Sequence, residues 1–475
     1  MHLDSLRGVL HLKNFLRYFG VDRAIFFTLL SRVWGLFSGP ITIYLIARFL
    51  SREEQGYFYT FGSILGLRVF FELGLGYVIM QSVSHEMAHL QWAEDGTLSG
   101  DPVAKSRLAS LFRFALKCYG CLALIGACLL LPAGLWFFGK SSEGAVLVIW
   151  RAPWLIVVCM ACFDLMLTPF YGFMEGCGKV AEYAKRGAWM AIISSLCFWI
   201  CLIFGGKLFA APLQNATCAV IGAFWVFVKY GRCFKDILAT PILPGAVISW
   251  KDDIFHFQWK IALSSLSGYF IFQLINPVLF RYKGPAEAGR MGMSMKMIDT
   301  LTGFAYSWVS TKAAPFGTYI ARREFQRLDD IFRQASRQSI GVTLTGGLAL
   351  FAGYFALRQY GVALAFRFLD PIPFFFLYAG GVVNCIIFCQ AIYLRAHREE
   401  PLLINSLVGA ALVPIAVLTF GPRYGASGIA IALFCLNIFV GLPWATWVFI
   451  TKRKQWHRFP SELENSVETL VNARH

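Results

Sequence analysis

Charged residues are scarce in this chain, and no connection between its apolar segments is long enough to fold as a separate soluble domain. Only 15% of the 475 residues are charged, compared with about 25% in an ordinary soluble domain. Hydrophobic residues make up 57% of the chain and aromatic residues 16%. This balance excludes a soluble globular protein and indicates a helix bundle embedded in lipid.

Two other signals are absent from the sequence. No GxxxxGK[ST] stretch occurs, which argues against an ATP-driven pump contained in one chain, because that motif cradles the nucleotide phosphates. The N-terminal stretch Met1–Asp22 is basic and amphipathic, without a continuous apolar run or a small-residue cleavage site, so we expect no cleavable signal peptide. Any function is therefore expected to be built inside the bundle.

Long apolar runs fill the chain from about Ile25 to about Ile450. Each can cross a hydrocarbon layer about 30 Å thick. We predict an all-α polytopic membrane protein with about 12 transmembrane helices, in two six-helix bundles around a central cavity. The predicted spans are Ile25–Leu45, Tyr57–Met80, Phe112–Phe138, Leu147–Tyr171, Ala188–Gly205, Leu208–Val228, Ile261–Phe280, Met291–Val309, Gly341–Phe355, Phe374–Leu394, Ile404–Phe420 and Gly428–Ile450.

The longest central connection, which contains Pro241, Pro244 and the charged run Lys251–Asp253, separates six spans from the next six. Duplicated six-helix bundles are a common transporter plan, because two similar bundles can rock about a shared cavity. We predict an N-terminal bundle over residues 1–230, a cytoplasmic linker over 231–258, a C-terminal bundle over 259–450 and a basic cytoplasmic tail over 451–475.

Most Lys and Arg residues lie in the connections on one side of the predicted spans, which places that side and both termini in the cytoplasm. The formal net charge of +16 then reflects basic connections beside anionic lipid, and we expect no nucleic-acid partner. The predicted location is the cytoplasmic (inner) membrane. The cysteines lie mostly in apolar spans and are interpreted as packing residues. The CxxC pairs at Cys118/Cys121 and Cys159/Cys162 have no adjacent histidines, so no metal is expected.

Several ionised residues nevertheless lie within the predicted spans. Near the bilayer centre each costs at least about 2.5–3.5 kcal/mol to insert, so it needs a partner, a cavity or a place near the interface. Arg68 and Glu72 are four residues apart on one helix face, and Lys296 and Asp299 form a similar pair in the second half. Each pair is either a structural ion pair or part of a charged cavity lining.

Arg32 is the preferred candidate for phosphate contact, because Gly35, Gly39 and Pro40 follow it and a broken helix can bend around a cavity. A guanidinium also suits bidentate contact with oxyanions. The alternative interpretation is a side chain that snorkels to the interface. Arg151 permits the same two interpretations close to the outer interface.

Asp164 is the only acid deep in the fourth span. A buried carboxylate suits reversible protonation or Na⁺ coordination during a transport cycle. It can equally neutralise Arg32 or Arg151. We therefore expect no cofactor, with H⁺ or Na⁺ coupling as an open possibility. Kinks are expected at Asn276-Pro277, Pro169 and Pro414.

Four stretches carry a family resemblance. Ala47–Ser84 contains a Leu-Ser turn with Glu and Gly (Leu50–Gly56) and an acidic residue before Gly-Leu-Gly (Glu72–Gly76). Phe170–Val180 carries a Glu-Gly-x-Gly loop, Gly284–Met297 a Gly-x-x-x-x-Gly stretch, and Ala314–Arg333 a proline-containing helix end with a basic loop. Together they resemble the polysaccharide transporter family of the multidrug/oligosaccharidyl-lipid/polysaccharide exporter (MOP) superfamily. Glu72 stands where members of that family often have Asp.

The resemblance implies a membrane transporter and not an enzyme: a flippase that moves polyprenyl-pyrophosphate-linked oligosaccharide to the outer leaflet for O-antigen, capsule or exopolysaccharide biosynthesis. Membrane lipid and polysaccharide polymerase or assembly proteins are the implied partners. A hydrated route with fixed cations would be needed, for which Arg32, Arg68, Lys296 and Arg151 are the candidates. The alternatives are a cation-coupled multidrug antiporter of the same superfamily and a polytopic lipid-glycan enzyme.

Overall fold

The computed structural model describes residues 23–72, 74–139, 148–244, 255–397 and 399–472. The predicted amphipathic segment Met1–Asp22 and the charged run Lys251–Asp253 lie outside these described residues. The chain packs as two compact units, Met1–Leu266 and Ser267–His475. Each unit is described by itself.

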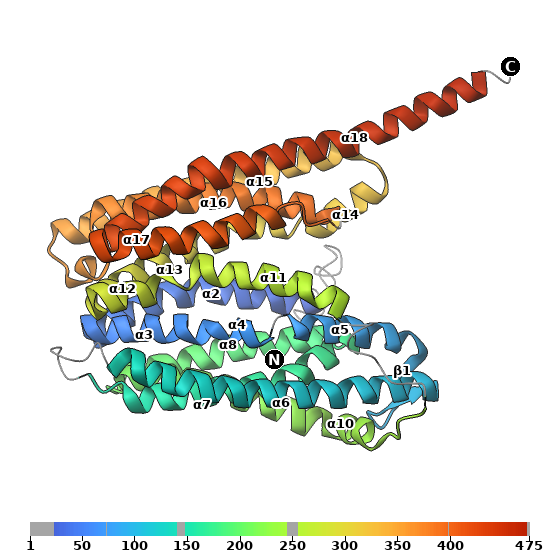
Figure 1. The fold of residues 1–475 in the computed structure, drawn as a ribbon, viewed down its shortest axis with the longest axis horizontal. Coiled ribbons are helices and arrows are strands. Elements are labelled where there is room, and N and C mark those ends of the chain that lie inside the picture. The colour runs from blue at the N-terminus through green and yellow to red at the C-terminus, as the bar shows by residue number, and fades with distance from the viewer. Residues whose placement is uncertain (1–22, 73, 140–147, 245–254, 398, 473–475) are drawn as a thin grey trace, which may run out of the picture. The chain divides into compact units, whose positions relative to one another are not determined.

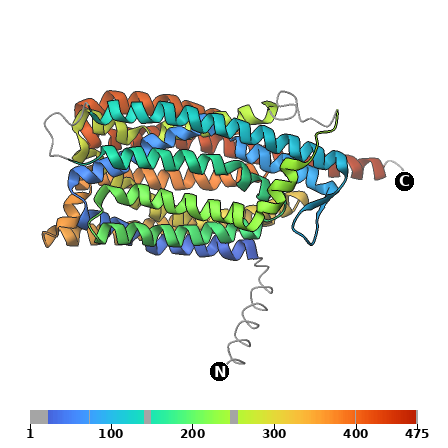
Figure 2. The same ribbon diagram turned by 90° about the horizontal axis from the view of Figure 1, so that it is seen from below.

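The first unit is a bundle of long helices that lie side by side (Figures 1 and 2). Two of its predicted spans are single uninterrupted helices of 26 and 24 residues, α7 and α8. Its elements are α2 (Arg23–Phe49), α3 (Arg52–Leu65), η1 (Gly66–Arg68), α4 (Val69–Glu72), α5 (Leu75–Glu86), η2 (Met87–His89), β1 (Leu90–Trp92), β2 (Leu98–Gly100), α6 (Pro102–Gly139), α7 (Arg151–Gly176), α8 (Val180–Ile203), η3 (Lys207–Phe209), α9 (Ala210–Phe224), η4 (Trp225–Lys229) and α10 (Tyr230–Ala239).

The second unit is also helical, and the boundary between the units falls inside its first helix, α11. Its elements are α11 (Phe255–Phe272), α12 (Ile275–Lys283), α13 (Pro285–Ser310), α14 (Ala313–Ala321), α15 (Phe325–Gln359), η6 (Ala363–Arg367), α16 (Pro371–Ala396), α17 (Leu403–Leu436), η7 (Asn437–Gly441) and α18 (Leu442–Asn472).

The structure confirms the all-α membrane fold. Eight helical stretches in the described part of the chain are long and apolar enough to cross a membrane, and the last of them, Leu403–His457, contains two predicted spans. These two separate at Gly425, whose φ of 64° lies in the left-handed region. The ninth predicted span is too short, because its helix runs from Phe325 to Gln359.

The prolines considered in the sequence analysis lie either inside continuous helices or near a helix start. The helices α2, α7 and α17 continue through Pro40, Pro169 and Pro414. The break expected at Asn276-Pro277 does occur, but it falls between α11 and α12. Pro277 is the third residue of α12, where its missing N–H costs no intrahelical hydrogen bond. The second predicted span is interrupted at Gly74, which has a φ of 72°.

The helices α5 and α7 approach each other through glycines. A Cβ atom added at Gly176 would lie 2.5 Å from the Met80 carbonyl oxygen, and one added at Gly172 would lie 2.9 Å from the Gly76 carbonyl oxygen. The backbones are therefore in direct contact, which only small residues permit. This contact brings the second and fourth predicted spans together.

A short antiparallel hairpin, β1–β2, follows α5, with Leu90 opposite Gly100 and Trp92 opposite Leu98. It lies at one end of the first-unit helices, beside α10 (Figure 1). The Trp92 indole donates to the Cys177 carbonyl oxygen at 3.0 Å, and Lys179 lies 4.3 Å from its ring centroid. The hairpin therefore fastens the α7–α8 turn, in which Gly178 has the left-handed φ of 81° expected of a Glu-Gly-x-Gly loop.

The two units repeat one packing order. The helix α7 forms the fourth predicted span of the first half and packs against α5, α6 and α9. The helix α16 forms the fourth predicted span of the second half and packs against α13, α15 and α18. Likewise α2 packs against α8, and α12 against α17. These contacts recur at the same places in the order of spans in both halves.

In each unit a late helix forms an ion pair with the first turns of the third long helix. In the first unit, α10 lies on α6, where Lys105 pairs with Asp236 at 2.8 Å. In the second, the residues predicted as a tail continue α18, and Arg453 pairs with Asp329 of α15. Tyr393 donates a hydrogen bond to the same carboxylate at 3.0 Å.

Candidate functional site

The broken second helix of the first unit carries two of the predicted site residues. After α3, the chain forms the single turns η1 and α4 before Gly74 restarts a helix. Arg68 and Glu72 lie on these turns. The Arg68 side chain is 55% exposed, and its Nη1 atom is 4.0 Å from Asp164 Oδ2 on α7. The structure thus joins Arg68 to Asp164, for which the sequence had suggested Arg32 or Arg151 as partners.

Glu72 lies at the closest approach of α4, α5, α6 and α7. A Cβ atom at Gly76 would lie 3.2 Å from Glu72 Oε1, 3.2 Å from the Tyr119 hydroxyl and 3.3 Å from Thr168 Cγ2. Glycine at this position therefore leaves just enough room for the carboxylate and the hydroxyl. The predicted Arg68–Glu72 ion pair is not among the ion pairs within 4.0 Å in the described residues.

Asp164 also connects to a buried cation that the sequence analysis did not select. Its Oδ1 atom accepts a hydrogen bond from the Tyr171 hydroxyl at 3.5 Å. The Arg186 guanidinium lies 3.6 Å from the centroid of the Tyr171 ring, and the rings of Tyr183 and Trp225 lie 4.9 and 5.4 Å away. Arg186 is only 7% exposed, so three aromatic faces stabilise its charge in place of water.

Sequence reasoning counted Arg186 among the basic connections, because the predicted fifth span begins at Ala188, whereas α8 begins eight residues earlier, at Val180. Aromatic residues three positions away on either side, Tyr183 and Trp189, were the available signal. Such spacing puts rings on the same helix face as the charge. Within the described residues, Nε and Nη1 of Arg186 have no hydrogen-bond partner.

The remaining predicted residues lie elsewhere. Arg32 is on an exposed part of α2. Arg151 is the first residue of α7, with its guanidinium 5.7 Å from the Trp150 ring centroid, as a residue at a membrane interface would be. Lys296 and Asp299 are exposed on α13 of the second unit. The roles of all these residues stay predictions.

The first-unit cluster therefore holds two cations, Arg68 and Arg186, and two acids, Glu72 and Asp164. At 4.0 Å the Arg68–Asp164 contact is longer than a hydrogen bond. The exposed guanidinium can offer its N–H groups to another anion, and planar guanidinium groups bind phosphate oxygens in pairs.

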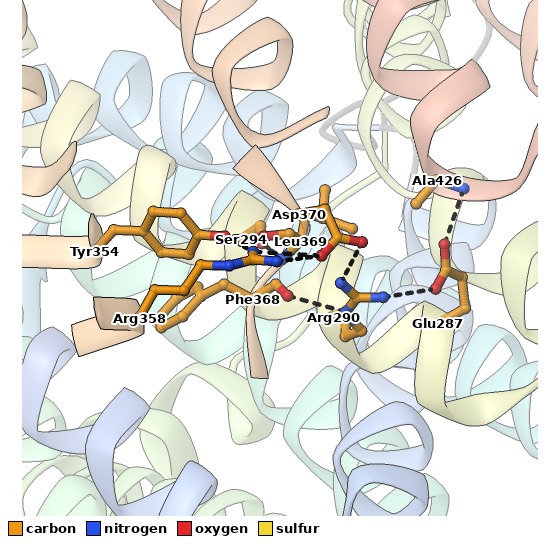
Figure 3. A network of polar contacts seen from close by, with 9 residues as sticks. All are labelled: Glu287, Arg290, Ser294, Tyr354, Arg358, Phe368, Leu369, Asp370 and Ala426. Atoms are coloured by element: carbon orange, nitrogen blue, oxygen red, sulfur yellow. Dashed lines mark hydrogen bonds and ion pairs between the residues drawn. The ribbon is translucent and has the colours of Figure 1, made fainter. Parts of the chain in front are cut away.

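A second polar network, not predicted from the sequence, lies in the second unit (Figure 3). Arg290 on α13 contacts Asp370 Oδ2 at 2.9 Å, donates to the Phe368 carbonyl oxygen at 2.9 Å and lies 3.5 Å from Glu287. Arg358 of α15 approaches Asp370 from the other side at 3.4 Å. The network fastens the α15–α16 connection to α13. It includes Glu287 and Arg290 of the Gly284–Met297 stretch.

No protein-family model matches the sequence, and no curated protein matches it. Among solved structures, the chain is similar to the lipid II flippase MurJ in an inward closed conformation, with 15% identity, a TM-score of 0.63 and coverage of 94% of this chain and 93% of that one.

It is also similar to an inward-facing multidrug resistance MATE family transporter of the MOP superfamily, with 16% identity, a TM-score of 0.59 and coverage of 90% of this chain and 96% of that one. A MOP superfamily transporter from Pyrococcus furiosus gives 14% identity, a TM-score of 0.52 and coverage of 92% and 96%. At these identities the likeness shows the fold, which this chain shares with multi-helix membrane transporters of the MOP superfamily.

Proposed function

We propose that this protein is a flippase that moves polyprenyl-pyrophosphate-linked oligosaccharide across the cytoplasmic membrane for surface polysaccharide biosynthesis. The observation that supports the proposal best is Arg68. Its guanidinium is exposed, lies on a break in an apolar helix and is held only loosely by Asp164. An ionised residue in such a place is costly unless it serves a hydrated route or a charged ligand. The fold is compatible with this function.

In the proposed cycle, the substrate pyrophosphate replaces Asp164 as the partner of Arg68. Arg32 and Lys296 supply further positive charge, and the two halves alternate between inward and outward access. The released Asp164 carboxylate keeps the hydrogen bond from Tyr171 or takes up a proton. Coupling to H⁺ or Na⁺ would act at this step.

The test is the pool of lipid-linked oligosaccharide in cells that lack the protein. Build-up of complete repeat units on the cytoplasmic leaflet, with loss of surface polymer, is expected. Reintroducing Arg68→Ala or Arg32→Ala should not restore the polymer, whereas Arg68→Lys should restore part of it. The exposed Arg327, which pairs with Glu324 at 2.9 Å, provides the control variant Arg327→Ala. Normal pools and normal polymer in the deleted strain would refute the proposal.

A cation-coupled multidrug antiporter is the second candidate, and the pairing of Asp164 with Arg68 and Tyr171 favours it. A carboxylate with exchangeable partners suits cation coupling. This function predicts unchanged lipid-linked pools but increased drug sensitivity in the deleted strain, with Asp164→Asn unable to restore resistance. Missing or incomplete repeat units would instead indicate a lipid-glycan enzyme.

A further inference from the structure

One short sequence pattern occurs at the same structural position in both halves. Glu54-Gln55-Gly56 lies in the first turn of α3, and Glu287-Ala288-Gly289 lies in the first turn of α13. Both helices open the second span of their half, and both glutamates are the third residue of the helix. The distribution of Lys and Arg residues predicts that this end of each unit faces away from the cytoplasm.

In the first unit, Glu54 reaches the turn between the fifth and sixth spans. One carboxylate oxygen accepts the Ser51 backbone N–H at 2.8 Å, as in a capping box. The other oxygen lies 3.1 Å from Lys207 Nζ in the α8–α9 turn. Glu54 is only 7% exposed, so its charge depends on these two partners. Lys207 itself has a left-handed φ of 49°, which is rare for a residue with a side chain.

In the second unit, Glu287 reaches the corresponding turn by different chemistry (Figure 3). One carboxylate oxygen lies 3.5 Å from Arg290 on its own helix. The other accepts the Ala426 backbone N–H at 3.3 Å, directly after the left-handed Gly425 that divides α17. In both halves, one oxygen thus binds the start of the second helix and the other binds a turn with a left-handed residue.

We propose that Glu54 and Glu287 are equivalent latches, each holding the turn between the fifth and sixth spans of its half against the start of the second span. Glu54 contacts a lysine side chain and Glu287 contacts a backbone amide, yet both hold the corresponding turn. Both halves therefore require this contact, whichever group provides it. The consequence is that these elements move together at the outward end of each half, whatever the transported substrate.

Hydrogen exchange measured by mass spectrometry on the purified full-length protein tests each latch locally. Glu54→Gln keeps the cap, because glutamine also accepts the Ser51 N–H, and removes only the charge that pairs with Lys207. We expect exchange of the α8–α9 turn amides, Gly206 and Phe209 among them, to rise about tenfold, with no change around Ala426. Glu53→Gln, which alters the neighbouring acid, is the matched control and should leave both turns unchanged.

The contact between Glu287 and the Ala426 backbone N–H needs a hydrogen-bond acceptor at position 287 and does not need a charge there. Glu287→Ala should therefore raise exchange around Ala426 about tenfold, whereas Glu287→Gln, which retains an acceptor, should keep most of the protection. In the first half, Lys207→Gln removes the same charge pair from the other side and should match Glu54→Gln. Unchanged exchange in Glu54→Gln and Glu287→Ala, or equal loosening of both turns by either one, would overturn the proposal.

Discussion

Replacing Gly176 by alanine is expected to separate α5 from α7 and so to disturb the contact on which the first-unit cluster depends. The added Cβ would lie 2.5 Å from the Met80 carbonyl oxygen and 2.7 Å from Val83 Cβ. Carbon atoms pack at about 3.5–4.0 Å, so α5 has to retreat by roughly 1 Å. A gap of about 0.5–1 Å forfeits a quarter to a half of the attraction in each facing contact.

Overpacked positions usually cost about 1–3 kcal/mol. Because the obstacle at Gly176 is a backbone carbonyl that no rotamer change can move, we expect about 2–3 kcal/mol. Gly187 on α8 is the matched control, since a Cβ atom there would meet nothing within 4 Å. Alanine in a helix interior is favoured over glycine by about 0.5–1 kcal/mol. The two variants should differ by about 3 kcal/mol, which is more than a hundredfold in the unfolding equilibrium.

The assay is thermal unfolding of the full-length protein in detergent, followed by tryptophan fluorescence and by recovery of the folded species on size exclusion. The Tm of Gly176→Ala should fall clearly below the wild-type value, and the Tm of Gly187→Ala should equal or exceed it. Equal stability of the two variants would show that α5 and α7 do not touch as described. The placement of Arg68 and Glu72 beside Asp164 would then also be wrong.

Three further changes follow from other contacts. Arg186→Lys should lower stability by about 1 kcal/mol, because an ammonium group cannot stack on Tyr171 as a planar guanidinium does; an unchanged Tm would contradict the aromatic enclosure. Trp92→Phe removes the indole donor to the Cys177 carbonyl oxygen, a loss of about 1 kcal/mol, and should speed tryptic cleavage at Lys179, whereas an unchanged cleavage rate would argue against a fastening hairpin. Burial lowers the pKa of His397, so the unfolded chain binds a proton that the folded chain does not as pH falls below about 6.5. The Tm should therefore drop between pH 7.5 and 5.5, and His397→Phe, which retains a ring against Trp456, should reduce that drop; an identical drop would exclude His397 as a source.

Hydropathy identified the helices because lipid exposure leaves a strong signal in every span. It misjudged α15, whose first residues alternate buried Leu328 and Ala335 with exposed polar side chains and so lie below the threshold of an apolar window. The hairpin was missed because each strand has only three residues, although Asp95-Gly96 is a common hairpin turn.

The candidate site was harder to predict because its contacts join distant segments. Periodicity placed Arg68 and Glu72 on one helix but carried no information on Asp164, which comes from another helix. The pattern Gly172-x-x-x-Gly176 could have indicated that α7 packs closely against a neighbour. Arg32 was favoured for the glycines and proline around it, yet α2 stays continuous there. Its role in phosphate contact stays a prediction.

The helices α10 and α18 carry opposite charges where each meets the third long helix of its own unit. Asp236 of α10 faces Lys105 of α6, whereas Arg453 of α18 faces Asp329 of α15. If the end helix of one half packed on the other half's third helix, two carboxylates or two cations would meet, and like charges in contact repel. A chain built from two similar halves must avoid exchanging their parts as it folds. With the inverted polarity, α10 and α18 each meet a complementary charge on their own half and would meet a like charge on the other.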